Sequence, residues 1–166
     1  MDNIVFQFVK PVVEPNSQAI MSMQDMGEMV GQIYNLMLSN GIKYKMEVSF
    51  PLCLIEEEIL NKLIDENRIN TCCHVQAGRG IVFDTDFRIL LCNHFIDYHY
   101  SDVKAGELGV EEIMDVFNSD VAKTFRKTAS YYPSKLCSKC EKWDICGGGC
   151  FTRWLFENPE EVIKGV

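Results

Sequence analysis

The stretch CSKCEKWDICGGGC, residues 137–150, contains four cysteines and three consecutive glycines. Two residues separate Cys137 from Cys140, a spacing that lets the chain turn so that both sulfurs face one metal centre. Cys146 follows after five more residues, and Cys150 follows the glycines. Because glycine has no Cβ, this run can take left-handed dihedrals and point backbone N–H groups at sulfur. The pattern predicts a thiolate site for a metal ion or a cluster.

The spacing of these four cysteines favours one of two kinds of site. An all-cysteine zinc site usually has two short pairs separated by a longer stretch, whereas only five residues separate Cys140 from Cys146. A zinc site within this stretch also gives no role to Cys73 and Cys92. The spacing therefore favours an iron–sulfur cluster, with zinc as the alternative.

Composition narrows the class of protein. The chain has eight cysteines and a net charge of −8. Its first residues lack a basic start and a small-residue cleavage site, so we expect no signal peptide. In the reducing cytoplasm, dense cysteines favour metal binding over disulfides. The sequence has no cluster of lysines and arginines of the kind that binds nucleic acid. It also has no apolar run as long as the roughly 18 residues that a membrane span needs. We expect a cytoplasmic protein without nucleic-acid or membrane partners.

Residues 1–70 have the pattern of an α/β domain. Residues 4–9 (IVFQFV) and 44–50 (YKMEVSF) are rich in β-branched and aromatic residues and predict strands. Between them, residues 25–41 predict a helix with Asp25 as its N-cap and a glycine after its last turn. The apolar stripe of this helix comprises Met26, Met29, Val30, Ile33, Leu36 and Met37. Strand, helix and strand in this order predict a parallel pair.

The rest of the chain predicts shorter elements. Residues 56–66 predict a second helix in the α/β part, and residues 80–92 (GIVFDTDFRILLC) predict a hairpin that turns at DTD. Residues 110–128 predict one helix, acidic in its first turn and basic in its last. Its apolar side comprises Ile113, Val116, Phe117, Val121 and Phe125. The predicted fold class is α/β over residues 1–70, followed by a small cysteine-rich α+β domain over residues 71–166.

The cysteine spacings resemble those of the SPASM domain, the carboxy-terminal extension of many radical SAM enzymes. Cys137-x2-Cys140-x5-Cys146-x3-Cys150 resembles the core of that domain. Upstream, the family has a cysteine, nine to fifteen residues, a glycine, four residues and a cysteine. Here thirteen residues follow Cys73, then come Phe87, four residues and Cys92. Phe87 stands where the family has glycine, a departure expected to alter the hairpin turn.

The resemblance implies two auxiliary [4Fe-4S] clusters. It assigns one to Cys73, Cys92 and Cys150, and the other to Cys137, Cys140 and Cys146. Each cluster then needs one more ligand. For the first cluster, Cys72 and Cys53 are the candidates, unless that iron is open. For the second, the family supplies a cysteine downstream of the glycines, but this sequence has none after residue 150.

The same resemblance implies that the chain is part of a larger enzyme. Radical SAM enzymes hold the SAM-binding cluster with Cys-x3-Cys-x2-Cys, a motif missing from this sequence, where Arg153 occupies the last position after Cys146 and Cys150. Residues 1–70 resemble the last βα units of a partial TIM-type barrel. We therefore expect a missing N-terminal region or a separate chain to carry the SAM-cleaving core, and this chain alone not to cleave S-adenosylmethionine.

Function follows from the resemblance in the same way. The complete enzyme is expected to modify a peptide or protein substrate, with the auxiliary clusters transferring electrons or docking the substrate. The alternative is a standalone module that binds zinc or a single cluster and recognises a partner without redox activity.

Overall fold

The computed structural model describes residues 4–13, 21–71, 73 and 80–163. It divides the chain into two compact units: the first joins Met1–Pro11, Gln18–Cys72 and Tyr132–Val166, and the second joins Val12–Ser17 and Cys73–Tyr131. The segment with Cys137–Cys150 thus folds with the α/β part of the chain. None of the described helices has the length and apolar character to cross a membrane.

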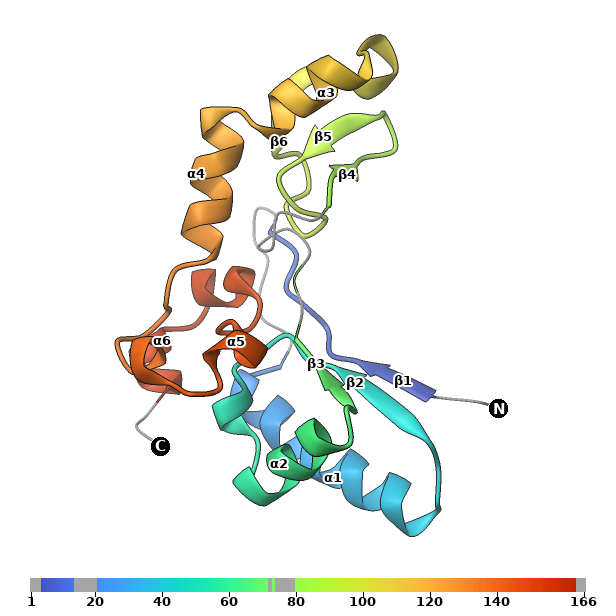
Figure 1. The fold of residues 1–166 in the computed structure, drawn as a ribbon, viewed down its shortest axis with the longest axis vertical. Coiled ribbons are helices and arrows are strands. Elements are labelled where there is room, and N and C mark those ends of the chain that lie inside the picture. Colours follow the sequence, from blue (N-terminus) through green and yellow to red (C-terminus); the bar gives the residue numbers. More distant parts are fainter. Residues whose placement is uncertain (1–3, 14–20, 72, 74–79, 164–166) are drawn as a thin grey trace. The chain divides into compact units, whose positions relative to one another are not determined.

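The first unit is built on a three-stranded parallel sheet (Figure 1). Its strands β1 (Ile4–Gln7), β2 (Tyr44–Glu47) and β3 (Ile69–Asn70) lie in the order β1-β2-β3. Helices α1 (Met23–Ser39) and α2 (Glu57–Asp65) connect them and lie on the same side of the sheet in Figure 1. The predicted strand–helix–strand unit with parallel pairing and the second helix are confirmed.

The bounds of α1 differ from the prediction at the N-terminus. Ser22 is the N-cap, and its hydroxyl accepts a hydrogen bond of 3.1 Å from the backbone N–H of Asp25. Asp25 is therefore inside the first turn, and its prediction as the cap was wrong. Gly41 has φ of +62°, as expected for a glycine after a helix. Leu36 was placed in the apolar stripe but is 57% exposed.

The sheet has one covered and one uncovered face. Tyr44 and Met46 are buried in the core with α1 and α2, whereas the alternate residues Lys45 and Glu47 are exposed. On the exposed face Gln7 donates a hydrogen bond of 2.5 Å to the carboxylate of Glu47. Parallel sheets usually have both faces covered, so a polar, uncovered face is unusual.

The C-terminal segment of the first unit consists of short helical turns. These are η3 (Cys137–Lys139), α5 (Trp143–Cys146), η4 (Phe151–Leu155) and α6 (Pro159–Val162). A further 3-10 turn, η1 (Leu52–Leu54), follows β2.

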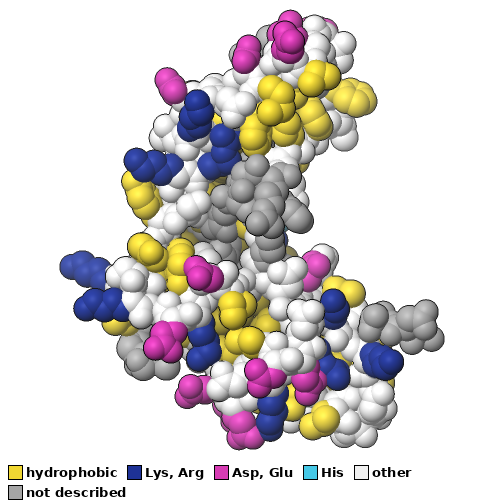
Figure 2. Space-filling model, in the orientation of Figure 1, with side chains coloured by type: hydrophobic (Ala, Val, Ile, Leu, Met, Phe, Trp, Pro, Cys, Tyr) yellow, Lys and Arg dark blue, Asp and Glu magenta, His cyan; other side chains and the backbone are white. Residues whose placement is uncertain are grey.

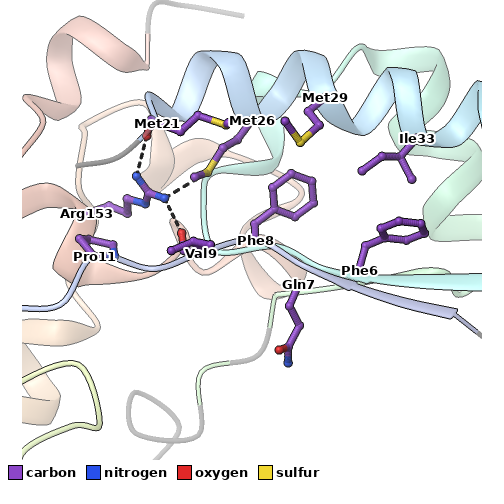
Figure 3. Close-up of a pocket in the computed structure, with 10 residues that line it drawn as sticks. All are labelled: Phe6, Gln7, Phe8, Val9, Pro11, Met21, Met26, Met29, Ile33 and Arg153. Carbon is purple, nitrogen blue, oxygen red and sulfur yellow. Dashed lines mark hydrogen bonds between the residues drawn. The ribbon is translucent and has the colours of Figure 1, made fainter. Parts of the chain in front are cut away.

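Arg153 in η4 holds this segment to the α/β part (Figure 3). Its side chain is only 2% exposed. Its guanidinium donates hydrogen bonds to the carbonyl oxygens of Met21 at 2.9 Å and Val9 at 2.5 Å, and it contacts the sulfur of Met26 at 3.1 Å. A single buried cation thus joins the end of β1, the start of α1 and the C-terminal segment.

The second unit is an antiparallel sheet with two helices. Strands β4 (Val82–Phe83), β5 (Arg88–Leu90) and β6 (His99–Lys104) pair in that order and confirm the predicted hairpin. After η2 (Ala105–Glu107) come α3 (Val110–Phe117) and α4 (Asp120–Ala129).

The single helix predicted over residues 110–128 was wrong, because the chain breaks between α3 and α4. Asn118 ends α3, and the Ser119 hydroxyl accepts a hydrogen bond of 3.3 Å from the N–H of Ala122 to begin α4. Val121, placed on the apolar side, is 60% exposed. Apolar side chains that remain exposed gather over the hairpin and α3 (Figure 2), among them Phe83, Phe87, Val110 and Met114.

Phe87 lies in the hairpin turn, in a conformation that glycine usually adopts. Asp84 and Arg88 close a three-residue loop, in which the N–H of Phe87 donates to the carbonyl of Asp84 at 3.1 Å. Phe87 has φ of +64°, the left-handed position that such loops usually fill with glycine. The turn keeps the backbone of a glycine position while carrying an exposed phenylalanine.

Candidate metal centre

Four cysteines of the first unit line one cavity. The cavity has a volume of about 380 Å³, and its lining includes Cys53 from η1 together with Cys137, Cys140 and Cys146. Three of these thiols come from the stretch of residues 137–150. The fourth comes from a segment far away in the sequence.

Backbone contacts bring these two segments together. The N–H of Leu52, next to Cys53, donates a hydrogen bond of 3.3 Å to the Cys146 sulfur, although the two residues are 94 positions apart. The N–H of Cys150 donates to the carbonyl of Ser49 at 2.9 Å. The cysteine loop therefore lies along the chain that leads from β2 into η1.

The three glycines make this close approach possible. Gly147, Gly148 and Gly149 have φ of +56°, +75° and +76°, which confirms the left-handed backbone expected of this run. A Cβ on Gly149 would lie 2.7 Å from the Cα of Phe50 and 3.0 Å from the nitrogen of Pro51. Glycine is required there for both its dihedral and its missing side chain.

The electrostatics of the cavity disfavour free thiolates. Burial, followed by the nearby charges of the other three cysteines, raises the pKa of the Cys53 thiol to about 11. Burial also raises the pKa of Cys137 and Cys146. Hydrogen bonds from the backbone N–H groups of Leu52 and Gly148 oppose this rise at Cys146. A positively charged metal centre reverses this balance, because it stabilises the ionised sulfur.

The walls of the cavity suit a group shielded from water. Apolar side chains that line it are Leu52, Ile55, Leu60, Leu136, Trp143 and Ile163. Charged residues Glu57, Lys139, Glu141 and Lys142 line it as well. A largely apolar shell controls solvent access and the local dielectric of a metal site, and thereby its redox potential.

Cys150 is in the same unit but is not one of the described residues that line this cavity. It is buried, and its sulfur lies 3.0 Å from the hydroxyl of Thr152.

The other expected ligands belong to the second unit or lie outside the described residues. Cys92 is buried, and its sulfur lies 3.4 Å from the Asn93 side-chain oxygen and 3.5 Å from Nδ1 of His94. Cys73 is half-buried, and Cys72 lies outside the described residues.

None of the seven described cysteines is part of a disulfide. Within the described ranges, no three His, Cys, Asp or Glu side chains stand in the geometry for a single metal ion. The assignment of the six or seven cysteines to particular clusters therefore stays a prediction.

Sequence reasoning missed the place of Cys53, which it considered only for the first cluster. The structure places it beside the other three cavity thiols. No spacing rule could have found this neighbour, because metal-ligand patterns are readable only where the ligands share one loop.

Comparison with known proteins tests the resemblance. No curated protein and no solved structure matches the chain. Among protein families, residues 69–141 match SPASM, described as an iron–sulfur cluster-binding domain. The match includes Cys73, Cys92, Cys137 and Cys140 and stops before Cys146. Residues 69–141 are therefore consistent with a SPASM domain, and the family that they match binds iron–sulfur clusters.

Proposed function

We propose that this chain binds two auxiliary [4Fe-4S] clusters as the C-terminal part of a radical SAM/SPASM enzyme that modifies a peptide or protein. The observation that carries the proposal is the walled cavity where Cys137, Cys140 and Cys146 meet, at the end of a SPASM match. These three cysteines hold one cluster. Cys73, Cys92 and Cys150, with Cys72 as the candidate for the remaining position, hold the other.

When bound, such clusters accept and donate single electrons. The protein's contribution is to exclude water and to set the potential through hydrogen bonds to sulfur. The N–H of Leu52 supplies one such bond to Cys146 at 3.3 Å. Indole and aliphatic side chains, including Trp143 and Leu60, line part of the cavity, while Cys140 is exposed.

The sheet of the first unit supports the partial barrel in this proposal. In a (β/α)8 barrel, consecutive strands are neighbours, the helices cover the outer face, and the inner face surrounds the barrel axis. Here the order is β1-β2-β3, α1 and α2 share one side, and the other face is polar and uncovered. A separate chain or an N-terminal region would add the remaining strands and the SAM-cleaving motif.

Anaerobic reconstitution tests the function. The chain is incubated with iron and sulfide, and iron, sulfide and zinc are then quantified. We expect about eight irons per chain, four for each cluster. Replacing Cys73 and Cys92 with alanine should remove about half of the iron, and so should replacing Cys137 and Cys140. Stoichiometric zinc without iron would contradict the proposal.

Zinc is the second candidate, because four cysteines around one cavity are also a ligand set of structural zinc sites. In such a closed site, zinc lies about 2.3 Å from each sulfur. A cavity of about 380 Å³ favours a bulkier group. Zinc would fill only the cavity site, so the Cys73/Cys92 variant would then retain all of the bound metal.

A further inference from the structure

We propose that Cys53 is the fourth thiolate ligand of the cluster held by Cys137, Cys140 and Cys146. The inference rests on the proposed function and adds to it a ligand from the α/β part, outside the SPASM match at residues 69–141.

The position of Cys53 supports its assignment as a ligand. Cys53 lines the same cavity as the other three thiols. It is half-buried, in the 3-10 turn η1. A four-iron cluster takes one ligand at each iron, so three thiols from one loop leave one corner for a ligand that approaches from another segment.

The turn η1 and the cysteine loop of residues 137–150 are fixed to each other. Leu52 donates its N–H to the sulfur of Cys146, one of the three loop ligands. Gly149 lies against the backbone of Phe50 and Pro51 so closely that a methyl group has no room. The turn that carries Cys53 is therefore held next to the loop by contacts at the three residues that precede Cys53 in the chain.

Among the described residues that line the cavity, Cys53 is the best remaining donor. Cys150 is not one of these lining residues. The other lining side chains with oxygen donors are Glu57 and Glu141. Iron–sulfur clusters are held by cysteine thiolates, so the thiol is preferred over either carboxylate.

Complete ligation determines what the cluster can do. With four thiolates, every iron of the cluster has a protein ligand and none is open to bind substrate. Of the two expected roles, electron transfer then belongs to this cluster, and any docking of substrate at an iron belongs to the other.

The test uses the full chain with Cys73→Ala and Cys92→Ala, so that only the cavity cluster forms. In this background we compare Cys53→Ala and Cys53→Ser with the matched controls Glu57→Gln and Glu141→Gln. Iron is counted after anaerobic reconstitution, and the reduced cluster is recorded by electron paramagnetic resonance with and without added cyanide, a ligand for open iron.

The parent and both glutamate controls should bind about four irons and show spectra that cyanide does not change. Both Cys53 variants should lose iron, falling to about three per chain after mild oxidation, or show a spectrum that cyanide changes. Four irons with an unaltered, cyanide-insensitive spectrum in Cys53→Ser would overturn the assignment while leaving the proposed function intact.

Failure of the proposed function has a different signature. In that case the chain without substitutions would take up no iron, and the ligand assignment would be wrong as well.

Alkylation gives a readout that does not depend on a variant that folds. With a maleimide reagent and peptide mass spectrometry, Cys53 of the reconstituted chain without substitutions should be protected, and it should become labelled once a chelator removes the iron. Equal labelling in both states would also overturn the assignment.

Discussion

Replacing Gly149 with alanine separates backbone strain from steric exclusion in the cysteine loop. Gly149 has φ of +76°, and a Cβ there would lie 2.7 Å from the Cα of Phe50. A left-handed dihedral costs an L-residue about 1–2 kcal/mol. Forcing a methyl group into a packed site adds about 1–3 kcal/mol. We therefore expect Gly149→Ala to lower the free energy of unfolding by roughly 2–5 kcal/mol.

Gly147 provides the matched control. Its φ is +56°, but a Cβ there would have nothing within 4 Å. Gly147→Ala shares the dihedral strain and the change in the unfolded chain, so the two variants differ by the steric contribution alone, about 1–3 kcal/mol.

Tryptophan fluorescence during urea denaturation measures this difference. The chain has two tryptophans, Trp143 and Trp154, and both belong to the first unit. Their signal therefore follows the unit that contains the loop. Equal destabilisation by the two substitutions would refute the reasoning, because it would mean that the loop does not press against the backbone of Phe50 and Pro51, between β2 and η1.

Three further predictions concern single side chains. Phe87→Gly should stabilise the hairpin by about 1 kcal/mol by relieving its left-handed dihedral, seen as slower hydrogen exchange of hairpin amides; faster exchange would contradict this. Burial raises the pKa of Asp84, but hydrogen bonds from the hairpin backbone and from His99 prevail and lower it to about 2. The stability that Asp84 contributes should therefore be present above its ordinary pKa of 3.8 and lost as pH falls towards 2; Asp84→Asn should abolish this part of the acid dependence of unfolding. Arg153→Met should lower the free energy of unfolding by about 3–5 kcal/mol, because it leaves Glu157 and two carbonyl groups without their buried cation. Adding Glu157→Gln should recover part of that loss, measured by the same tryptophan fluorescence.

Local signals in the sequence predicted helices and strands well where all the signals of a segment indicated the same element. β-branched and aromatic runs predicted β1 and β2, and the DTD turn predicted the hairpin. The predictions failed where two local signals competed. Apolar periodicity ran across residues 110–128, but Ser119 is also a strong N-cap, and the cap prevailed. Likewise Ser22, not Asp25, begins α1.

The sequence by itself determined the class of site. Cysteine spacing and the glycine run reflect the geometry of one loop around one centre, and that geometry is local in the chain. The left-handed dihedrals of Gly147–Gly149 follow from the same local logic. The SPASM match at residues 69–141 also supports iron–sulfur binding.

Only the tertiary structure decided which distant residues join that loop. Cys53 lines the cavity because η1 follows β2 closely, at the point where Gly149 lets the cysteine loop approach the backbone of Phe50 and Pro51. Arg153 is buried because the ends of β1 and α1 offer carbonyl oxygens to it. Such neighbours depend on packing between segments far apart in the chain, and packing of this kind leaves no periodicity or spacing in the sequence.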